Sequence, residues 1–150
     1  MKDSTLLRHS AYINGKWEAA GSGRTFPVNN PATGEVLAQV ADCGPAETQL
    51  AIAAAETALP AWRAKTAAQR SALLQRWNDL ILENAEDLAL LMTLEQGKPL
   101  AESRGEVRYG ASFIEWFAEE GRRVYGDIIP PHAPNLRVLV FKEPVGVVGA

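Results

Sequence analysis

The sequence predicts an α/β fold, and three successive regions predict it. Residues 10–43 combine short strand-like runs with turn residues, residues 45–126 have the apolar periodicity of helices, and residues 127–150 are rich in proline and β-branched residues. Two hairpins, four or five helices and then further strands indicate helices packed beside sheets. The length of 150 residues fits one domain, for which about 100–200 residues is usual.

Two hairpins are predicted in the first region. Asn14-Gly15 stands at the centre of residues 11–18, and this dipeptide tolerates the positive φ angles of a type I′ turn. A second, looser hairpin is predicted to join residues 25–28 to residues 35–40. Its turn, residues 30–34, contains a proline that presets φ and a glycine that closes the turn.

Three helices are expected between residues 45 and 99. Pro45 suits the first position of a helix, and Pro60 is expected to break that helix. Thr66-Ala67-Ala68-Gln69 has the form of a capping box, Asn84 is expected to cap the third helix, and Gly97 to end it. The second helix has one apolar face, made of Leu73, Leu74, Trp77, Leu80 and Ile81. The third helix is apolar on more than one side, with Leu88, Leu90, Leu91, Met92 and Leu94.

A longer helix is predicted from about Leu100 to Val124, with Gly126 as its cap. It carries two apolar stripes, and a helix with two apolar faces needs two partners. The first stripe consists of Val107, Ala111, Ile114, Ala118 and Gly121, and the second of Tyr109, Phe113, Trp116 and Phe117.

The third region is predicted to be a connector followed by two strands. Residues 128–134 contain three prolines and cannot form a regular helix. Arg137–Lys142 is apolar and β-branched, and after Pro144 the run Val145–Ala150 is expected to begin another strand. A continuous apolar run is typical of a strand buried on both faces, so we expect this strand to continue in a longer protein.

Composition excludes several classes of function. The 15 basic and 18 acidic residues give a net charge of −3, which argues against a nucleic-acid binder that relies on bulk positive charge. No apolar run approaches the roughly 20 residues that span a bilayer. The start of the chain, residues 1–8, has only two adjacent large apolar residues, whereas a secretory signal needs an apolar stretch of about 7–15. A single cysteine forms no internal disulfide. We therefore expect a cytoplasmic protein without membrane partners.

The sequence contains none of the common cofactor or metal motifs. Gly21-Ser22-Gly23 lacks the third glycine and the helix of a dinucleotide fingerprint, and there is no phosphate-binding loop, C-x-x-C or H-E-x-x-H. His9 and His132 lie in loop-like segments at opposite ends of the chain. No metal site is therefore expected.

Three further candidates each have an ordinary structural explanation. Cys43 is either a small buried or half-exposed thiol before a helix or a thiol activated by that helix's N-terminus. Glu119 and Glu120 could be a catalytic pair, but adjacent helical residues point about 100° apart, which favours a solvated face. For Lys98, in a Gly-Lys-Pro turn, a structural contact is favoured over a catalytic role. The residues alone thus indicate no catalytic constellation.

Four segments, in this order, nevertheless resemble the N-terminal part of the NAD(P)-dependent aldehyde dehydrogenases. The resemblance extends over essentially Ala11–Ala150, and within the family residues 94–102 and 112–121 are most similar to the succinate-semialdehyde dehydrogenases. The four segments are YINGKW (12–17), NPATGE (30–35), TLEQGKP (93–99) and KEPVGVVG (142–149).

The resemblance implies both an organisation and an activity. Residues 1–126 would be the helical N-terminal part of a nucleotide-binding domain, residues 127–144 a connector and an oligomerisation strand, and residues 145–150 the start of a strand of the nucleotide-binding sheet. The complete enzyme would oxidise an aldehyde, succinic semialdehyde, to the acid with NAD or NADP, as a homodimer or homotetramer. A cysteine thiolate attacks the aldehyde, amide donors hold the oxyanion, and a glutamate activates water.

The resemblance also implies what this chain lacks. In the family the oxyanion asparagine, the cofactor-binding glycines, the glutamate base and the nucleophilic cysteine all come later, and Cys43 does not match the nucleophile. The chain alone is therefore expected to be inactive and to bind no cofactor. Its partners would be the rest of its own chain and further copies of the enzyme. The alternative is a short, non-catalytic protein that binds aldehyde dehydrogenase subunits.

Two sites are suggested by the resemblance alone. The helix that matches Leu100–Val124 lines the aldehyde tunnel in the family, which makes Tyr109 and Phe113 candidate tunnel residues; the alternative is that both rings pack in the core. Some members hold a monovalent cation near the positions of Val28 and Glu95.

Overall fold

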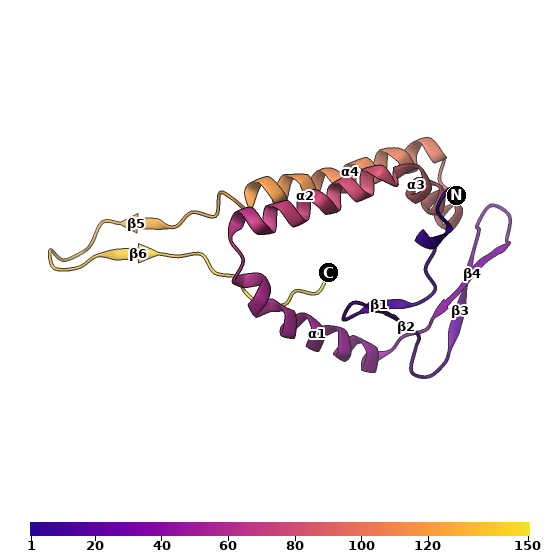
Figure 1. The fold of residues 1–150 in the computed structure, drawn as a ribbon, viewed down its shortest axis with the longest axis horizontal. Coiled ribbons are helices and arrows are strands. Elements are labelled where there is room, and N and C mark those ends of the chain that lie inside the picture. Colours follow the sequence, from indigo (N-terminus) through magenta and orange to yellow (C-terminus); the bar gives the residue numbers. More distant parts are fainter.

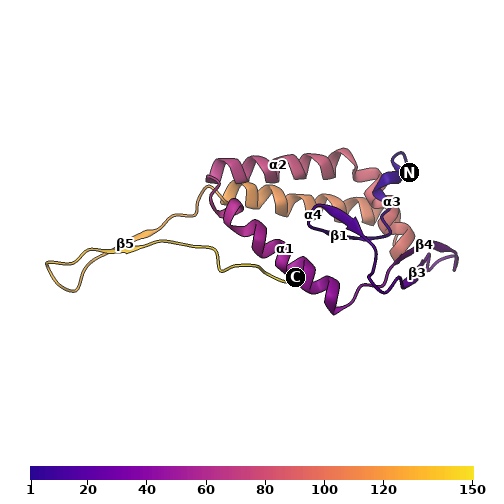
Figure 2. The same ribbon diagram turned by 60° about the horizontal axis from the view of Figure 1, so that its bottom comes forward.

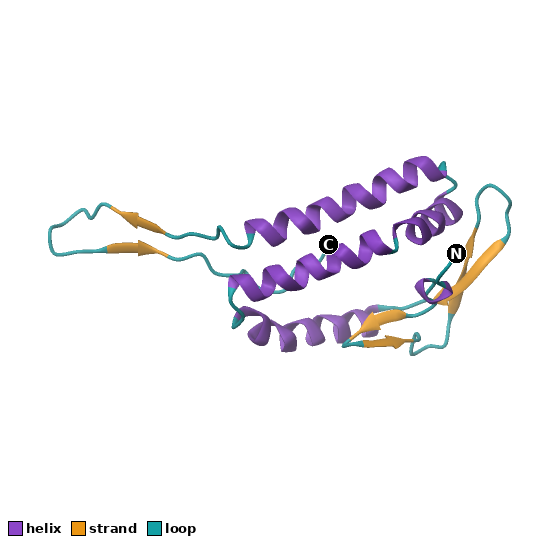
Figure 3. Cartoon of the chain, turned by 45° about the horizontal axis from the view of Figure 1, so that its top comes forward, coloured by secondary structure: helices purple, strands orange, loops and turns teal.

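The computed structural model describes residues 1–150, and its hairpins and helices follow the predicted order (Figures 1 and 3). Its last pair of strands joins residues 127–129, which were expected in the connector, to residues 138–140, which lie in the predicted strand 137–142. The elements are η1 (Ser4–Leu6), β1 (Ala11–Ile13), β2 (Lys16–Glu18), β3 (Thr25–Asn29), β4 (Val36–Ala41), α1 (Pro45–Arg63), α2 (Ala67–Glu83), α3 (Ala85–Gln96), α4 (Leu100–Glu120), β5 (Asp127–Ile129) and β6 (Val138–Val140).

Both predicted N-terminal hairpins are confirmed. β1 pairs with β2 in antiparallel register, and Asn14 and Gly15 between them have φ angles of 49° and 78°. Positive φ at both central residues is what a type I′ turn requires. β3 pairs with β4 across a turn in which Gly34 has a φ of 75°. In both turns glycine occupies a backbone conformation that most side chains disfavour.

Three helices form the main layer. α2 and α4 lie side by side, and α3 lies at one end of the pair (Figures 1 and 2). The capping box of α2 is present, with Thr66 and Gln69 as its two partners. The seam between α2 and α4 is built from small and polar residues, Ser71 and Asn78 on one side and Ala111 and Ala118 on the other, all buried. Small side chains allow the two backbones to approach closely.

The predicted apolar face of α2 is split by this seam. Leu74 and Ile81 are half-buried beside it, whereas Leu73, Trp77 and Leu80 remain exposed. The five apolar residues do lie on one helix, as predicted, but α4 covers a different side of α2 from the one on which most of them lie. α3 has partners on two sides, as predicted: α4 on one side, and the β3–β4 hairpin on the other.

The prediction that Pro60 breaks the first helix is wrong. α1 continues through Pro60 to Arg63, and Ala64 donates its backbone N–H to the Pro60 carbonyl oxygen. A proline removes one intrahelical hydrogen bond and crowds the preceding turn. Pro60 stands in the last turn of an exposed helix, so the carbonyl group that loses its partner can be hydrated and the helix ends soon afterwards.

Two predicted helix ends also differ from the structure. Asn84 is the N-cap of α3, but its side chain makes no capping bond and instead donates from Nδ2 to the Leu80 carbonyl oxygen at 2.8 Å. α4 ends at Glu120 with Gly121 as its C-cap, not at Val124 with Gly126. Gly126 has another role, because a Cβ atom there would overlap the backbone of Val140 on the opposite strand.

The last region forms an arm. β5 and β6 pair in antiparallel register and project away from the helices (Figure 1). The chain then returns toward α1, where Arg63 forms an ion pair with Glu143 at 2.7 Å. The strand predicted over residues 145–150 is not formed in this structure, because no neighbouring strand lies beside it to make a ladder. None of the helices is long and apolar enough to cross a membrane.

Candidate functional site

The candidate site is the face of α4 that turns away from α2 and α3. The first predicted stripe of α4 packs against those helices with three buried residues, and Ser103, which was not part of the predicted stripe, is buried on the same face. The four buried residues recur at intervals of four or seven. Residues with this spacing share one face of a helix. The buried residues are Ser103, Val107, Ala111 and Ala118.

The second stripe of α4 carries four exposed aromatic rings, Tyr109, Phe113, Trp116 and Phe117. Tyr109 and Phe113 stack edge to face, with ring centroids 4.8 Å apart and planes at 80°. This geometry is favourable for aromatic quadrupoles. Tyr109 is 65% exposed and Phe113 47% exposed, so neither ring belongs to the core of residues 1–150.

A shallow, open hollow of about 580 Å³ lies beside Phe113. Its lining combines three aromatic side chains with two carboxylates and a hydroxyl group: Phe113, Trp116, Phe117, Glu115, Glu119 and Ser112. No cationic side chain belongs to this lining. The surface is therefore suited to an apolar chain, whereas an anionic group would be repelled by the two glutamates.

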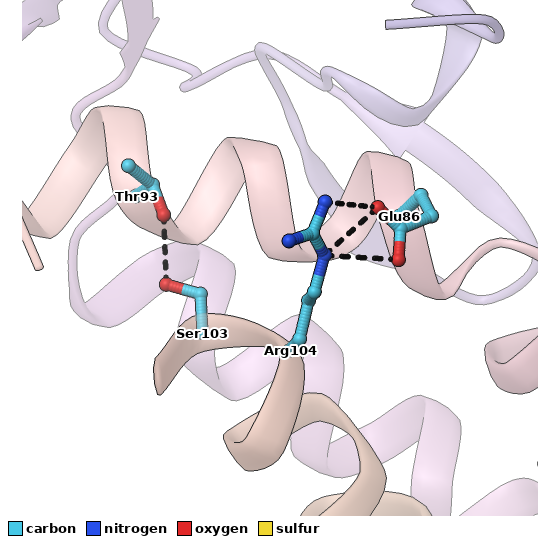
Figure 4. A network of polar contacts seen from close by, with 4 residues as sticks. All are labelled: Glu86, Thr93, Ser103 and Arg104. Atoms are coloured by element: carbon cyan, nitrogen blue, oxygen red, sulfur yellow. Dashed lines mark hydrogen bonds and ion pairs between the residues drawn. The ribbon is translucent and has the colours of Figure 1, made fainter. Parts of the chain in front are cut away.

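Two polar contacts fix α4 against α3 (Figure 4). The hydroxyl groups of Thr93 and Ser103 are hydrogen-bonded at 2.8 Å, with Ser103 completely buried. Arg104 donates from Nε and Nη2 to the carboxylate of Glu86 at 2.8–3.0 Å. The hydrogen bonds from Arg104 lower the pKa of Glu86, and the same contact raises the pKa of Arg104. These contacts hold the aromatic face in a defined position.

The other sequence candidates have ordinary structural surroundings. Cys43 is exposed, so the expectation of a buried or half-exposed thiol is wrong. Lys98 forms an ion pair with Glu106. Glu119 accepts a hydrogen bond from Gln75 at 3.2 Å, while Glu120 pairs with Arg123, so the two adjacent carboxylates point apart.

The two histidines do not belong to a cluster of metal-ligating side chains. His9 Nδ1 lies 3.1 Å from the Gln39 carbonyl oxygen, and no group of three histidine, cysteine or acidic side chains in residues 1–150 is arranged to hold a metal ion. Val28 and Glu95 do come together, on the wall of a small apolar cavity between the β3–β4 hairpin and α3. A cation near these two residues stays a prediction.

Comparison with known proteins decides the family. The profile of the aldehyde dehydrogenase family matches residues 17–150. The chain belongs to the aldehyde dehydrogenase family. The resemblance of the four sequence segments is thereby confirmed, and so is the expectation that the fold matches the N-terminal part of such enzymes.

The similar aldehyde dehydrogenases include enzymes for short semialdehydes. The chain is 60% identical over all 150 residues to the glutarate-semialdehyde dehydrogenase of Pseudomonas putida and 55% identical to the NADP(+) succinate-semialdehyde dehydrogenase of Escherichia coli, and it covers 31% of each. It superposes on succinate-semialdehyde dehydrogenase from Burkholderia pseudomallei with a TM-score of 0.95 and 59% identity, over 97% of this chain and 30% of that one. The chain thus spans less than a third of these relatives.

The Gly21-Ser22-Gly23 segment, which lacks the dinucleotide fingerprint, contacts the start of α1. At the start of α1, Glu47 already accepts backbone N–H bonds from Gly44 at 2.7 Å and Gly21 at 2.9 Å. These two bonds, the first of them the stronger cause, lower the pKa of Glu47. The turn at Gly21 is therefore tied to the start of α1 through the Glu47 carboxylate.

Sequence reasoning found the aromatic stripe but missed what supports it. Glu86 and Arg104 lie 18 residues apart, and Thr93 and Ser103 lie 10 apart on different helices. No local pattern distinguishes these polar residues from solvated ones. The local signal at this point was Gly97, which was predicted to end the third helix and has a φ of 74° as its C-cap.

Proposed function

We propose that the protein is an NAD(P)-dependent aldehyde dehydrogenase that oxidises succinic semialdehyde, or a semialdehyde of similar length, to the dicarboxylic acid. Residues 1–150 are its N-terminal part and hold no catalytic residue. The observation that carries this proposal is the identity of 55–60%, over the whole chain, to relatives named succinate- and glutarate-semialdehyde dehydrogenases.

The contribution of this part is a wall of the substrate tunnel. Tyr109 and Phe113 are exposed in residues 1–150, are stacked on each other, and stand on a helix that α3 and α2 hold in place. In the complete enzyme these rings contact the apolar chain of the aldehyde and exclude water from it. The two glutamates of the neighbouring hollow would repel the carboxylate of the substrate. That carboxylate is therefore bound by residues elsewhere in the enzyme.

The remaining parts of the proposal concern what surrounds residues 1–150. The cofactor, NAD or NADP, binds outside them. Residues 1–126 are the helical part of the nucleotide-binding domain, residues 127–144 supply a strand for subunit contacts in a dimer or tetramer, and residues 145–150 begin a strand of the nucleotide-binding sheet. The exposed apolar side chains of the arm support the subunit contact. The enzyme works in the cytoplasm.

A chimaera tests the activity. Residues 1–150 would replace the matching N-terminal 31% of the Pseudomonas putida relative, and reduction of NAD or NADP would be followed with succinic and glutaric semialdehyde. The chimaera should turn over both aldehydes, and residues 1–150 alone neither. Turnover by residues 1–150 alone that is lost in Cys43→Ala would make Cys43 the nucleophile. A folded chimaera that binds cofactor without turnover would contradict the proposal.

The tunnel wall is tested in the same chimaera. Phe113→Ala and Tyr109→Ala should change the relative kcat/KM among succinic semialdehyde, butanal and benzaldehyde, because the rings contact the aldehyde chain. Trp77→Ala, which removes an exposed ring from α2, is the control and should leave these ratios unchanged. A core residue would behave differently, with a stability loss of about 3–5 kcal/mol for Phe→Ala and unchanged ratios; that result would exclude the tunnel.

A further inference from the structure

The first residues of the chain are bound to α3 through a single carboxylate. Asp87 accepts the backbone N–H of Lys2 at 2.8 Å on Oδ1 and at 2.9 Å on Oδ2, and that of Asp3 at 2.8 Å on Oδ2. Asp87 is only 9% exposed. Both oxygens of Asp87 therefore hold residues 2 and 3, which lie more than 80 positions away in the sequence. Figure 1 shows the N-terminus beside α3.

Next to this contact the segment has its own local order. Asp3 Oδ1 accepts hydrogen bonds from the backbone N–H of Thr5 at 2.8 Å and from its hydroxyl group at 2.6 Å, which caps η1. A carboxylate that accepts backbone donors forms a stronger bond than a neutral acceptor. The two aspartates thus link α3, the first three residues and η1 in series.

The other end of the segment is attached to the hairpins. The carbonyl oxygen of His9 accepts the N–H of Ala41 on β4 at 2.9 Å. The guanidinium group of Arg8 lies 4.8 Å from the ring centroid of Trp17 on β2, a cation–π contact. Residues 1–8 therefore run from α3 to the hairpins and are held at both ends.

Between its two attachments the segment covers an apolar cavity of about 80 Å³. Met1, Leu7 and Arg8 line it from the segment. The opposite walls come from the β3–β4 hairpin and from α3, with Val28, Leu37, Ala38, Val40, Leu91, Leu94 and Glu95. Burial of apolar surface by the segment therefore contributes to holding the hairpin against the helix.

We propose that residues 1–8 are a strap that Asp87 latches, and that the latched strap clamps the β3–β4 hairpin onto α3. The latch recognises backbone N–H groups, so the side chain of residue 2 is of little importance while its N–H group is essential. The strap lies outside residues 17–150, which the family profile matches. Opening the latch uncovers the cavity and frees the hairpin.

A pair of substitutions at one position tests the latch in the full-length protein. Lys2→Pro removes the backbone donor, because proline has no N–H, whereas Lys2→Ala keeps it. The rate of trypsin cleavage after Arg8, followed by mass spectrometry, reports the open population when opening is fast relative to cleavage. We expect cleavage to be about tenfold faster in Lys2→Pro than in Lys2→Ala. Equal rates in the two variants would overturn the latch.

A second pair tests the carboxylate and the clamp. Asp87→Asn should also accelerate cleavage after Arg8, while Glu86→Gln, a change at the neighbouring carboxylate that binds Arg104 instead, should not. Amide hydrogen exchange should rise in β3 and β4 of Asp87→Asn and stay unchanged in β5 and β6. Unchanged exchange in β3 and β4 despite a released strap would overturn the clamp.

Discussion

The helical layer and the arm contrast in how they bury apolar side chains. Eight of the ten buried residues lie in α2, α3 and α4, and none lies in β5 or β6. Yet the arm carries large apolar side chains too, with Ile128 82% exposed and Phe141 78% exposed. The eight are Ser71, Asn78, Asp87, Ala89, Ser103, Val107, Ala111 and Ala118.

The contrast teaches that apolar composition does not by itself decide burial. In the helical layer, alanine and serine residues let two long helices approach closely, and the larger side chains pack only at the edges of the seam. The arm has only its backbone ladder, and an isolated two-stranded hairpin is at best marginally stable in water. A region can therefore be strongly apolar and still depend on a partner for its stability.

The largest effect is expected from overfilling the seam. Ala111→Leu adds three carbon atoms between α2 and α4 and should cost about 1–3 kcal/mol of unfolding free energy. Ala101→Leu makes the same change on the exposed side of α4 and should stay within about 0.5 kcal/mol of the wild type. Urea denaturation followed by circular dichroism measures both. Similar losses in the two variants would show that the seam is not closely packed.

A smaller loss is expected when the buried hydroxyl pair is broken. Ser103→Ala leaves the Thr93 hydroxyl group without its partner, which should cost about 1–2 kcal/mol. Replacing both partners, as Thr93→Val with Ser103→Ala, should recover part of that loss because no unpaired hydroxyl group remains. The same urea titrations provide the double-mutant cycle. Strictly additive losses would mean that the two hydroxyl groups do not interact.

Acid should weaken the helical layer before the arm. Backbone hydrogen bonds from Asp3 and then Lys2 lower the pKa of Asp87, and Arg104 lowers that of Glu86. A carboxylate with a lowered folded-state pKa contributes stability above its unfolded-state value, about pH 4, and this contribution is lost as the pH falls through the folded-state pKa. The urea concentration at the unfolding midpoint should therefore decrease as the pH is lowered below about 4. This decrease should be less steep in Asp87→Asn than in the wild type. Parallel pH profiles for the two proteins would contradict this assignment.

The smallest effect on stability is expected from the arm itself. Deleting residues 137–150 removes side chains that are already mostly exposed, so the unfolding free energy should change by about 0.5 kcal/mol or less. The monomer fraction in size-exclusion chromatography should rise, because the deletion removes an open strand edge. An unchanged or lower monomer fraction would argue against association through the arm.

The sequence by itself determined the local features. The turn at Asn14-Gly15, the capping box at Thr66 and the end of α3 at Gly97 were all predicted, because each depends on the conformational preference of a few adjacent residues. The separation of the Tyr109–Phe113 stripe from the buried stripe of α4 was also predicted. It follows from helical geometry alone.

Only the tertiary structure decided how these elements meet. The latch at Asp87, the pairing of Glu86 with Arg104 and the close approach at Gly126 each join residues that are distant in the sequence. It also selected which apolar stripes are covered: the small residues of α4 are buried against α2, while its aromatic rings and Trp77 of α2 stay exposed. The physical reason is that a stripe records a preference for burial, whereas burial itself requires a surface of matching shape on another element.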